Sequence, residues 1–338
     1  MASDLRLVPV QDLRALEALA TPWARLHRRC ADATPFQSPQ WLIPWWRHVG
    51  EGALYTFAAY AGDELAAVLP LYIWERAQPR ARFVLPLGAG TSDYLDVVCE
   101  PGSRGAVAEA LRRQLERDRA RFDGCEFAQL RPTSVLLEMA LPDRWRDECN
   151  QAEPCPVLDL RAGRSVEECV PARMVQNLRY YRRRAERRSP LHFRHAQADS
   201  ASAMFERLAS LHGARWSTRN APGVLASDAV RRAHRETIPA LARAGMLRMY
   251  ELVMGERVAA ALYGLADARE GGSFHYYIGG YEPALADVSP GTLLIAHAIE
   301  QALVEGAGTF DFLRGREPYK YLWGARDRPT WTRRCHPD

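Results

Sequence analysis

Apolar residues between Val10 and Cys30 recur at intervals of three and four, which predicts an amphipathic helix at the start of the chain. A break follows, and the aromatic segment 41–46 indicates a second, short helix. Ser38 can act as the N-cap of that helix, with Pro39 at its first position.

The pattern then changes to runs with β-type composition. The runs 54–61 and 65–74 are separated by Gly62-Asp63-Glu64, which predicts a hairpin. A helical pattern at 104–121 and a short apolar strand at 126–130 follow. The first half is therefore expected to alternate helices with strands.

The second half repeats this order, from two helices to a hairpin and then to a strand, a helix and a strand. The corresponding segments are 200–215, 227–244, 247–254, 258–266, 273–279, 292–305 and 309–313. A constant offset of 193 residues aligns Gly62 with Gly255 and Leu69 with Leu262. So long a repeat indicates duplication of a whole mixed α/β domain, so we expect domains at 1–152 and 153–338.

Composition is that of a globular protein, with 47% hydrophobic and 25% charged residues among 338. The seven cysteines form no Cys-x-x-Cys pair, so neither a disulfide framework nor a cysteine zinc site is indicated, and we expect no metal. The net charge of +4 is too small to imply DNA binding. Of the 45 lysine and arginine residues, Lys320 alone is lysine.

The first residues show no basic stretch followed by an apolar segment, and no apolar run reaches the length of a spanning helix. We therefore expect a cytoplasmic protein, with peripheral contact to the inner membrane as an option.

Two segments in the second half carry candidate chemistry at backbone turns. Ser289, Gly291 and Thr292 lie at the predicted start of a helix, where free amide groups bind phosphate or pyrophosphate. A plain capped helix is the alternative interpretation of this segment.

The segment from Asp311 to Lys320 is the densest in charged side chains. Asp311 lies within the predicted strand 309–313 and faces a buried surface, so it needs a partner or a function. Arg314, Glu317 and Lys320 could fix an anionic ligand or stabilise an oxyanion, with Tyr319 among them. A structural ion-pair loop is the alternative. Lysine differs from arginine as a compact charge with a tunable pKa, which favours a specific role for Lys320.

Three further segments supply candidates. Asp93, Tyr94 and Asp96 precede a strand in the first half and could bind an amine or hydroxyl, with Asp93 as a general base. His275 lies on a central strand of the second half with Tyr277 beside it. It could take a proton from an attacking amine or could be a satisfied core histidine.

The segment Arg173–Arg188 holds seven arginines and one acid, Glu186. This density favours a phosphate-bearing partner, either an anionic membrane, a nucleotide or RNA, over a merely solvated helix face. Asn177 and Arg179 lie within it as candidate substrate contacts.

These segments, together with Phe36-Gln37-Ser38-Pro39-x-Trp41, resemble the GNAT-type acyltransferases of the CelD-like branch, a branch associated with cellulose and exopolysaccharide biosynthesis and distantly similar to the Fem peptidyltransferases. The resemblance covers nearly the whole chain. It implies an α/β (α+β) fold of two tandem GNAT-like domains, each a mixed, mostly antiparallel sheet flanked by helices.

The resemblance also implies an acyl-CoA donor with its pyrophosphate at Asp287–Thr292, and it gives Lys320 the position of a late lysine that contacts substrate in Fem-type enzymes. The leading hypothesis is acyl transfer from a CoA thioester to an amine of an envelope lipid or sugar precursor, with a sphingoid base as one specific acceptor. His275, Asp93 or a water would take the proton, and strand amides with Lys320 or Arg314 would stabilise the oxyanion.

Two alternatives stay open. One is Fem-like aminoacyl transfer from charged tRNA, in which the arginine-rich segment contacts RNA. The other is a non-catalytic accessory protein of polysaccharide synthesis, because the loop at 286–291 lacks a glycine of the GNAT pattern and contains Asp287.

Overall fold

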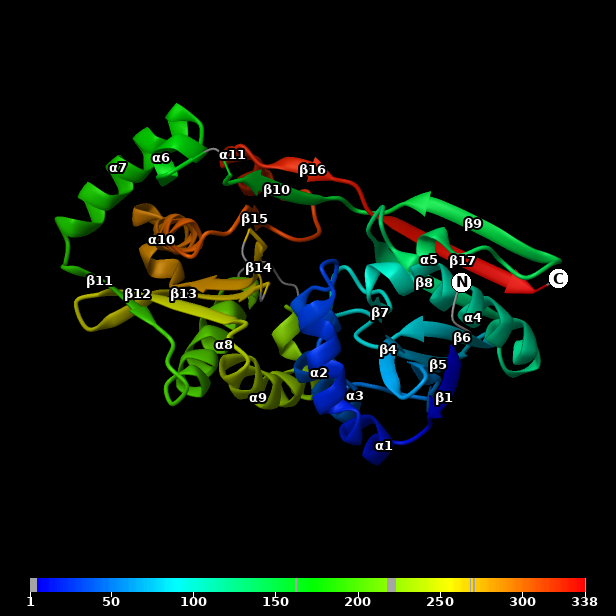
Figure 1. Ribbon diagram of the computed structural model, residues 1–338. Helices are drawn as coiled ribbons and strands as arrows, with labels where there is room; N and C mark the ends of the chain where they lie inside the picture. Colours follow the sequence, from blue (N-terminus) through cyan, green and yellow to red (C-terminus); the bar gives the residue numbers. More distant parts are fainter. Residues whose placement is uncertain (1–4, 162, 218–222, 268, 270, 338) are drawn as a thin grey trace. The chain divides into compact units, whose positions relative to one another are not determined.

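The computed structural model describes residues 5–161, 163–217, 223–267, 269 and 271–337 (Figure 1). The chain divides into two compact units. Unit 1 comprises residues 1–153 and 329–338, and unit 2 comprises residues 154–328. The last ten residues, placed with the second domain by sequence, lie in unit 1 because β17 (Trp331–Pro337) pairs with both β8 (Gly124–Leu130) and β9 (Trp145–Gln151).

Unit 1 contains a four-stranded sheet in the order β1-β3-β4-β7 and a six-stranded sheet in the order β2-β5-β6-β8-β17-β9. Its other strands are β1 (Arg6–Val10), β2 (Ala53–Leu54), β3 (Thr56–Ala61), β4 (Glu64–Leu69), β5 (Leu71–Ala77), β6 (Arg80–Pro86) and β7 (Val98–Cys99). Its α-helices are α1 (Leu13–Ala18), α2 (Ala20–Arg29), α3 (Pro39–His48), α4 (Arg104–Arg117) and α5 (Val135–Glu138).

The predicted strand 65–74 is in fact two strands, β4 and β5, which enter different sheets. The break falls at Pro70, because proline has no N–H to continue a hydrogen-bonded ladder. The sequence likewise predicted one helix over 10–30, whereas α1 and α2 meet at Leu19.

Unit 2 contains one seven-stranded sheet in the order β11-β12-β13-β14-β15-β10-β16. The strands are β10 (Cys155–Asp159), β11 (Leu191–His195), β12 (Leu247–Met254), β13 (Arg257–Ala266), β14 (Ser273–Tyr281), β15 (Thr309–Asp311) and β16 (Arg326–Arg328). The α-helices are α6 (Val166–Cys169), α7 (Ala172–Glu186), α8 (Ala201–Ser217), α9 (Asp228–Arg243), α10 (Pro290–Val304) and α11 (Pro318–Leu322).

Helices α7 and α10 lie over one face of this sheet, and α8 and α9 lie over the other (Figure 1). The strand pairs are antiparallel except β14 with β15, which are parallel because α10 connects them as a crossover. A mixed, mostly antiparallel sheet flanked by helices is the predicted fold class, and it is confirmed.

Candidate active site

The parallel strands β14 and β15 separate in the middle of the sheet. They pair only from Ser273 with Thr309 to His275 with Asp311, and β14 then continues to Tyr281 beside β13 but without β15. Beyond His275, the edge of β14 that faces β15 has no strand partner among the described residues. The two strands therefore form no ladder beyond this position.

A pocket of about 260 Å³ opens at this separation, and we refer to it as the wedge pocket. Its lining includes Tyr276, Gly279 and Gly280 of β14, Gly291 and Thr292 of α10, and Tyr319 of α11. The structure thus brings together three residues that the sequence analysis selected from two separate motifs, namely Gly291, Thr292 and Tyr319.

Two adjacent glycines shape the strand side of the wedge pocket. A Cβ on Gly279 would come within 2.1 Å of the Tyr276 hydroxyl, so the tyrosine ring folds over the strand only because position 279 has no side chain. A Cβ on Gly280 would come within 2.7 Å of the backbone nitrogen of His212 in α8. Gly279 therefore accommodates a pocket side chain, and Gly280 accommodates a helix.

The start of α10 forms the opposite wall. Ser289 occupies the N-cap position, but it adopts a left-handed conformation with φ of 50° and its side chain makes no capping hydrogen bond. Its carbonyl instead accepts from the N–H groups of Thr292 and Leu293. The Gly291 N–H has no hydrogen-bond acceptor among the described residues and stays free for an anion.

Asp287, in the short helix Pro283–Val288 that precedes α10, is paired with two arginines of the arginine-rich segment. Its carboxylate accepts from Arg184 at 2.7 Å and from Arg188 at 2.8 Å. The hydrogen bond from Arg188 and that from Arg184 hold the pKa of Asp287 below its usual range. The acid that departs from the GNAT loop pattern is therefore neutralised, and one net positive charge remains beside the helix start.

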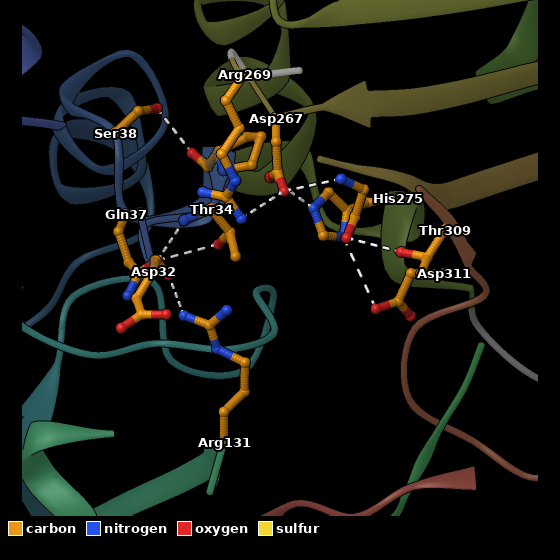
Figure 2. A network of polar contacts seen from close by, with 12 residues as sticks. Asp32, Thr34, Gln37, Ser38, Arg131, Asp267, Arg269, His275, Thr309 and Asp311 are labelled. Carbon is orange, nitrogen blue, oxygen red and sulfur yellow. Dashed lines mark hydrogen bonds and ion pairs between the residues drawn. The ribbon is translucent and has the colours of Figure 1, made fainter. Parts of the chain in front are cut away.

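His275 lies at the last paired position of β14, with a carboxylate on each side (Figure 2). Its Nε2 is 2.9 Å from Oδ1 of Asp267, and its Nδ1 is 4.0 Å from Oδ2 of Asp311. All three side chains are almost fully buried. Burial raises the pKa of Asp267, but the charge and hydrogen bond of His275, together with Arg269, outweigh it and bring that pKa below its ordinary value.

Asp311 turns the chain away from the sheet. Its Oδ1 accepts from the N–H of Leu313 at 2.8 Å, which holds Leu313 in a left-handed conformation with φ of 57°. Its Oδ2 lies 3.3 Å from a guanidinium nitrogen of Arg328 in β16. The predicted buried acid thus has partners on three elements, and it fixes the point where β14 and β15 separate.

Lys320 is 3% exposed and points into the turn that follows β15. Its ammonium group donates to the carbonyls of Leu313, Arg314 and Gly315 at 3.0, 2.7 and 3.2 Å, and it lies 2.9 Å from Oε2 of Glu317. Four oxygens surround one nitrogen, so the charge of Lys320 is directed into the loop that carries Arg314.

Tyr277 lies on the separated part of β14 and contacts a histidine that the sequence analysis did not select. The Tyr277 hydroxyl is 3.5 Å from Nε2 of His234 in α9, and the Tyr263 ring packs against both. Burial lowers the pKa of His234 to about 4, so its imidazole is neutral at physiological pH. Nothing in the helical pattern around His234 distinguishes it from an ordinary buried histidine.

The predicted site residues of unit 1 lie in one buried loop. Asp96 accepts from the N–H groups of Val97, Val135 and Leu136 at 2.8 to 3.2 Å, so its carboxylate caps the start of α5. Burial raises its pKa, although these hydrogen bonds oppose the rise. Asp93 and Tyr94 are also buried, and the guanidinium of Arg131 lies over the Tyr94 ring.

The remaining candidates are on α7. Asn177 is half-buried, and Arg179 lines a second groove, between α7 and α10, rather than the wedge pocket. Within the ranges that the structure describes, no group of three histidine, cysteine or acidic side chains could hold a metal ion. Within the same ranges, no helix is long and apolar enough to span a membrane.

Residues 172–321 match the family model described as the acetyltransferase (GNAT) domain. The match lies in unit 2 and includes α7, the wedge pocket and Lys320. The matched residues make up less than half of the chain, and their similarity to this domain supports an acyltransferase. The CelD-like branch is not identified by the match and stays a prediction.

The chain has no match among the curated proteins, but solved structures share its fold. FemX has a TM-score of 0.65 at 10% identity, over 92% of this chain and 94% of that chain. A C-terminal domain assigned to a lysylphosphatidylglycerol synthetase of Agrobacterium fabrum has a TM-score of 0.61 at 11% identity, over 95% and 92%. L-PGS from Bacillus licheniformis has a TM-score of 0.55 at 12% identity, over 95% and 91%. At such identities the likeness shows the fold alone.

Proposed function

We propose that the chain transfers an acyl group from a CoA thioester to an amine of an envelope lipid or sugar precursor, with a sphingoid base as one specific acceptor. The wedge pocket is the observation that carries this proposal. Its lining joins Gly279 and Gly280 of β14 to Gly291, whose N–H has no acceptor among the described residues. The strand amides would receive the thioester carbonyl, and the helix start would receive the pyrophosphate.

Residues of α7, α9 and β14, together with Arg188, supply the charge and the proton acceptor. Arg184 and Arg188 neutralise Asp287, so the departure from the GNAT loop pattern does not exclude a phosphate. The acceptor nitrogen attacks the thioester carbonyl, the C–S bond breaks and CoA leaves as a thiolate. We assign the amine proton to His234, relayed by the Tyr277 hydroxyl. His275, with Asp267 and Asp311, would hold the strands at the separation point.

One experiment tests the donor. Purified protein is titrated calorimetrically with acetyl-, medium-chain and long-chain acyl-CoA, and thiol release is followed with a sphingoid base or an amino sugar as acceptor. Binding of at least one acyl-CoA together with acceptor-dependent thiol release supports the proposal. The absence of binding at every chain length would contradict it and would favour the accessory protein.

The alternative donor is aminoacyl-tRNA, which the exposed arginines of α7 favour. Specific tRNA binding that persists at moderate salt concentration, with no acyl-CoA binding, would support the alternative. The base is tested separately. Tyr277→Phe and His234→Gln should lower kcat and flatten its pH profile, whereas His275→Asn should lower stability together with activity.

A further inference from the structure

Helix α7 presents a row of arginines with no acidic partner. Arg179, Arg183 and Arg187 follow one another at intervals of four, which places them on one face of the helix. All three are exposed, and none forms an ion pair with a described residue. The neighbouring Arg182 is paired with Glu186 at 2.9 Å, whereas the row is a local concentration of uncompensated positive charge.

An apolar groove runs beside this row, between α7 and α10. It has a volume of about 180 Å³ and is lined by Leu178, Leu191, Phe193 and Leu293, with Arg179 at its rim. The Phe193 ring is 36% exposed and stacks on His297 at 4.1 Å. The groove therefore brings an aliphatic surface to solvent directly next to the cations.

Two further exposed apolar side chains lie on the same part of unit 2. Tyr180, adjacent to Arg179 on α7, is 52% exposed, and Leu322 at the end of α11 is 59% exposed. The end of α11 is close to the start of α7, because a Cβ on Gly324 would be 3.1 Å from Pro171. Exposed aromatic and aliphatic groups among cations are typical of a helix that lies in a membrane interface.

We propose that this face of α7 docks on an anionic phospholipid surface, with lipid phosphates on Arg179, Arg183 and Arg187 and one acyl chain in the groove between α7 and α10. The proposal deepens the proposed function, on which it rests for a membrane as the place of reaction. A membrane is favoured over RNA because the groove beside the arginines has an aliphatic lining, which suits an acyl chain and offers nothing to a nucleic acid backbone.

Vesicle flotation tests the docking surface. The full-length protein is mixed with vesicles of phosphatidylcholine alone or with 30% phosphatidylglycerol, at two salt concentrations. The variant carrying Arg179→Gln, Arg183→Gln and Arg187→Gln should bind the anionic vesicles about 100-fold more weakly. A matched control changes Arg14, Arg25 and Arg28 of unit 1 to Gln, which alters the net charge equally and should bind like the wild type.

Two groove variants separate chain insertion from charge. Ala296→Trp fills the groove and Phe193→Ala removes its exposed ring, while the arginines stay in place. Both should bind anionic vesicles about 10-fold more weakly than wild type, and their thermal unfolding shows whether they fold. Wild-type binding by folded forms of both variants would contradict the acyl-chain site.

Equal loss of vesicle binding in both arginine triples, or no preference for anionic vesicles, would overturn the docking surface. So would tRNA that displaces vesicles at equal phosphate concentration through the same three arginines. Acyl-CoA binding is measured on the same wild-type preparation without vesicles. Failure to dock with intact CoA binding contradicts this inference alone, and docking without CoA binding contradicts the proposed function alone.

Discussion

The two units contain the same connection, a strand, a helix and a parallel strand, but the parallel strands separate at different positions. In unit 1 the connection is β6-α4-β8, and its parallel pairs are Phe83 with Gly124 and Val84 with Cys125. The offset of 193 residues places Phe83 and Val84 on Tyr276 and Tyr277. At those positions of unit 2 the strands have already separated. The wedge pocket therefore results from strands that stop pairing earlier.

The units also differ one strand earlier, at the matching positions Pro70 and Tyr263. In unit 1 the chain breaks at Pro70 and continues into a second sheet. In unit 2 the register shifts between Tyr263 and Gly264, so β13 stays one strand, and Tyr277 is the extra residue of a bulge on β14. A proline divides the sheet, whereas a bulge bends it, and the bend keeps β14 beside β13 along the wall of the pocket.

Each unit has one buried cation that binds three backbone carbonyls and a carboxylate. In unit 1, one terminal nitrogen of Arg333 donates to Leu136, Leu137 and Met139, and the rest of the guanidinium binds Asp147 at 3.0 and 2.8 Å. In unit 2, the single nitrogen of Lys320 holds all four oxygens. A planar guanidinium cannot place four oxygens around one nitrogen, which explains why lysine stands here in a chain otherwise rich in arginine.

The largest effect is expected at these two cations. Lys320→Met and Lys320→Arg should each lower the free energy of unfolding by about 4 kcal/mol, because three carbonyls lose their donor or receive one of the wrong shape. Arg333→Lys should also lower the free energy of unfolding, because the two hydrogen bonds from the guanidinium to the carboxylate of Asp147 are lost. Urea unfolding measures all three variants. Arg316→Lys, at an exposed position of the same loop, is the control and should change stability by less than about 0.5 kcal/mol.

The single lysine gives this prediction a direct spectroscopic test. With ¹⁵N-lysine labelling, the ammonium of Lys320 is the only side-chain signal, and its protons should exchange slowly with water while the loop is intact. A stable Lys320→Arg variant, or a rapidly exchanging Lys320 ammonium, would contradict a structural role for the four oxygens around Lys320. Either result would favour a role of Lys320 in stabilising the oxyanion.

The wedge pocket is tested at two matched glycines, each the second residue of its helix, Gly291 of α10 and Gly105 of α4. Gly291→Trp should fill the wedge pocket and weaken acyl-CoA binding at least 100-fold, about 3 kcal/mol. Gly105→Trp, where a side chain meets no atom within 4 Å, should leave binding unchanged. Calorimetric titration measures both variants. Equal affinities would show that the donor does not enter the wedge pocket.

The spacing of apolar residues and the positions of turn residues predicted much of unit 2. The strand before Ser289, the helix after it and the strand that ends near Asp311 all follow from apolar spacing and turn residues, so Gly291, Thr292 and Tyr319 could be selected. The partners of these residues could not, because they are distant in sequence. Asp267 and Arg328 stand in segments without a motif, and they are recognised only when the sheet brings them to His275 and Asp311.

In unit 1 the acids Asp93 and Asp96 were predicted to be binding groups because they precede a strand. Asp96 shows why a motif of acids near a strand is ambiguous, since its carboxylate is consumed by three N–H groups, two of which are about 40 residues away. A sequence shows that a carboxylate is present, but only the fold shows whether its lone pairs are already occupied.

A smaller effect is expected on the pH dependence of stability. The pKa of His234 is about 4 in the folded protein against an ordinary 6.5, so the unfolded chain binds the extra proton between these values and stability falls as pH falls from 6.5 towards 4. Between pH 7 and pH 5 the free energy of unfolding should fall by about 2 kcal/mol less in His234→Gln than in the wild type. Burial and the neighbouring His195 lower the pKa of His297 to about 4. His297 should therefore preserve part of the dependence of the unfolding free energy on pH in this variant.

Denaturant unfolding at both pH values measures this slope. His192→Gln, at an exposed histidine of β11, is the matched control and should leave it unchanged. The same slope in His234→Gln and in the wild type would show that His234 is not held neutral beside Tyr277, which would remove it as the proton acceptor.

The smallest change at the matched glycines makes the sharpest comparison between the units. Alanine is a better helix former than glycine, so Gly291→Ala and Gly105→Ala should each raise the free energy of unfolding by about 0.5 kcal/mol. A Cβ at position 291 meets the Tyr281 ring at 3.4 Å, an ordinary contact, so the variant folds without strain. Only Gly291→Ala should weaken acyl-CoA binding, several-fold, because the methyl group covers the free N–H at the start of α10. Thermal unfolding and calorimetry on the two variants separate these effects. If both variants gain stability and neither loses affinity for acyl-CoA, the N–H of Gly291 does not bind the donor.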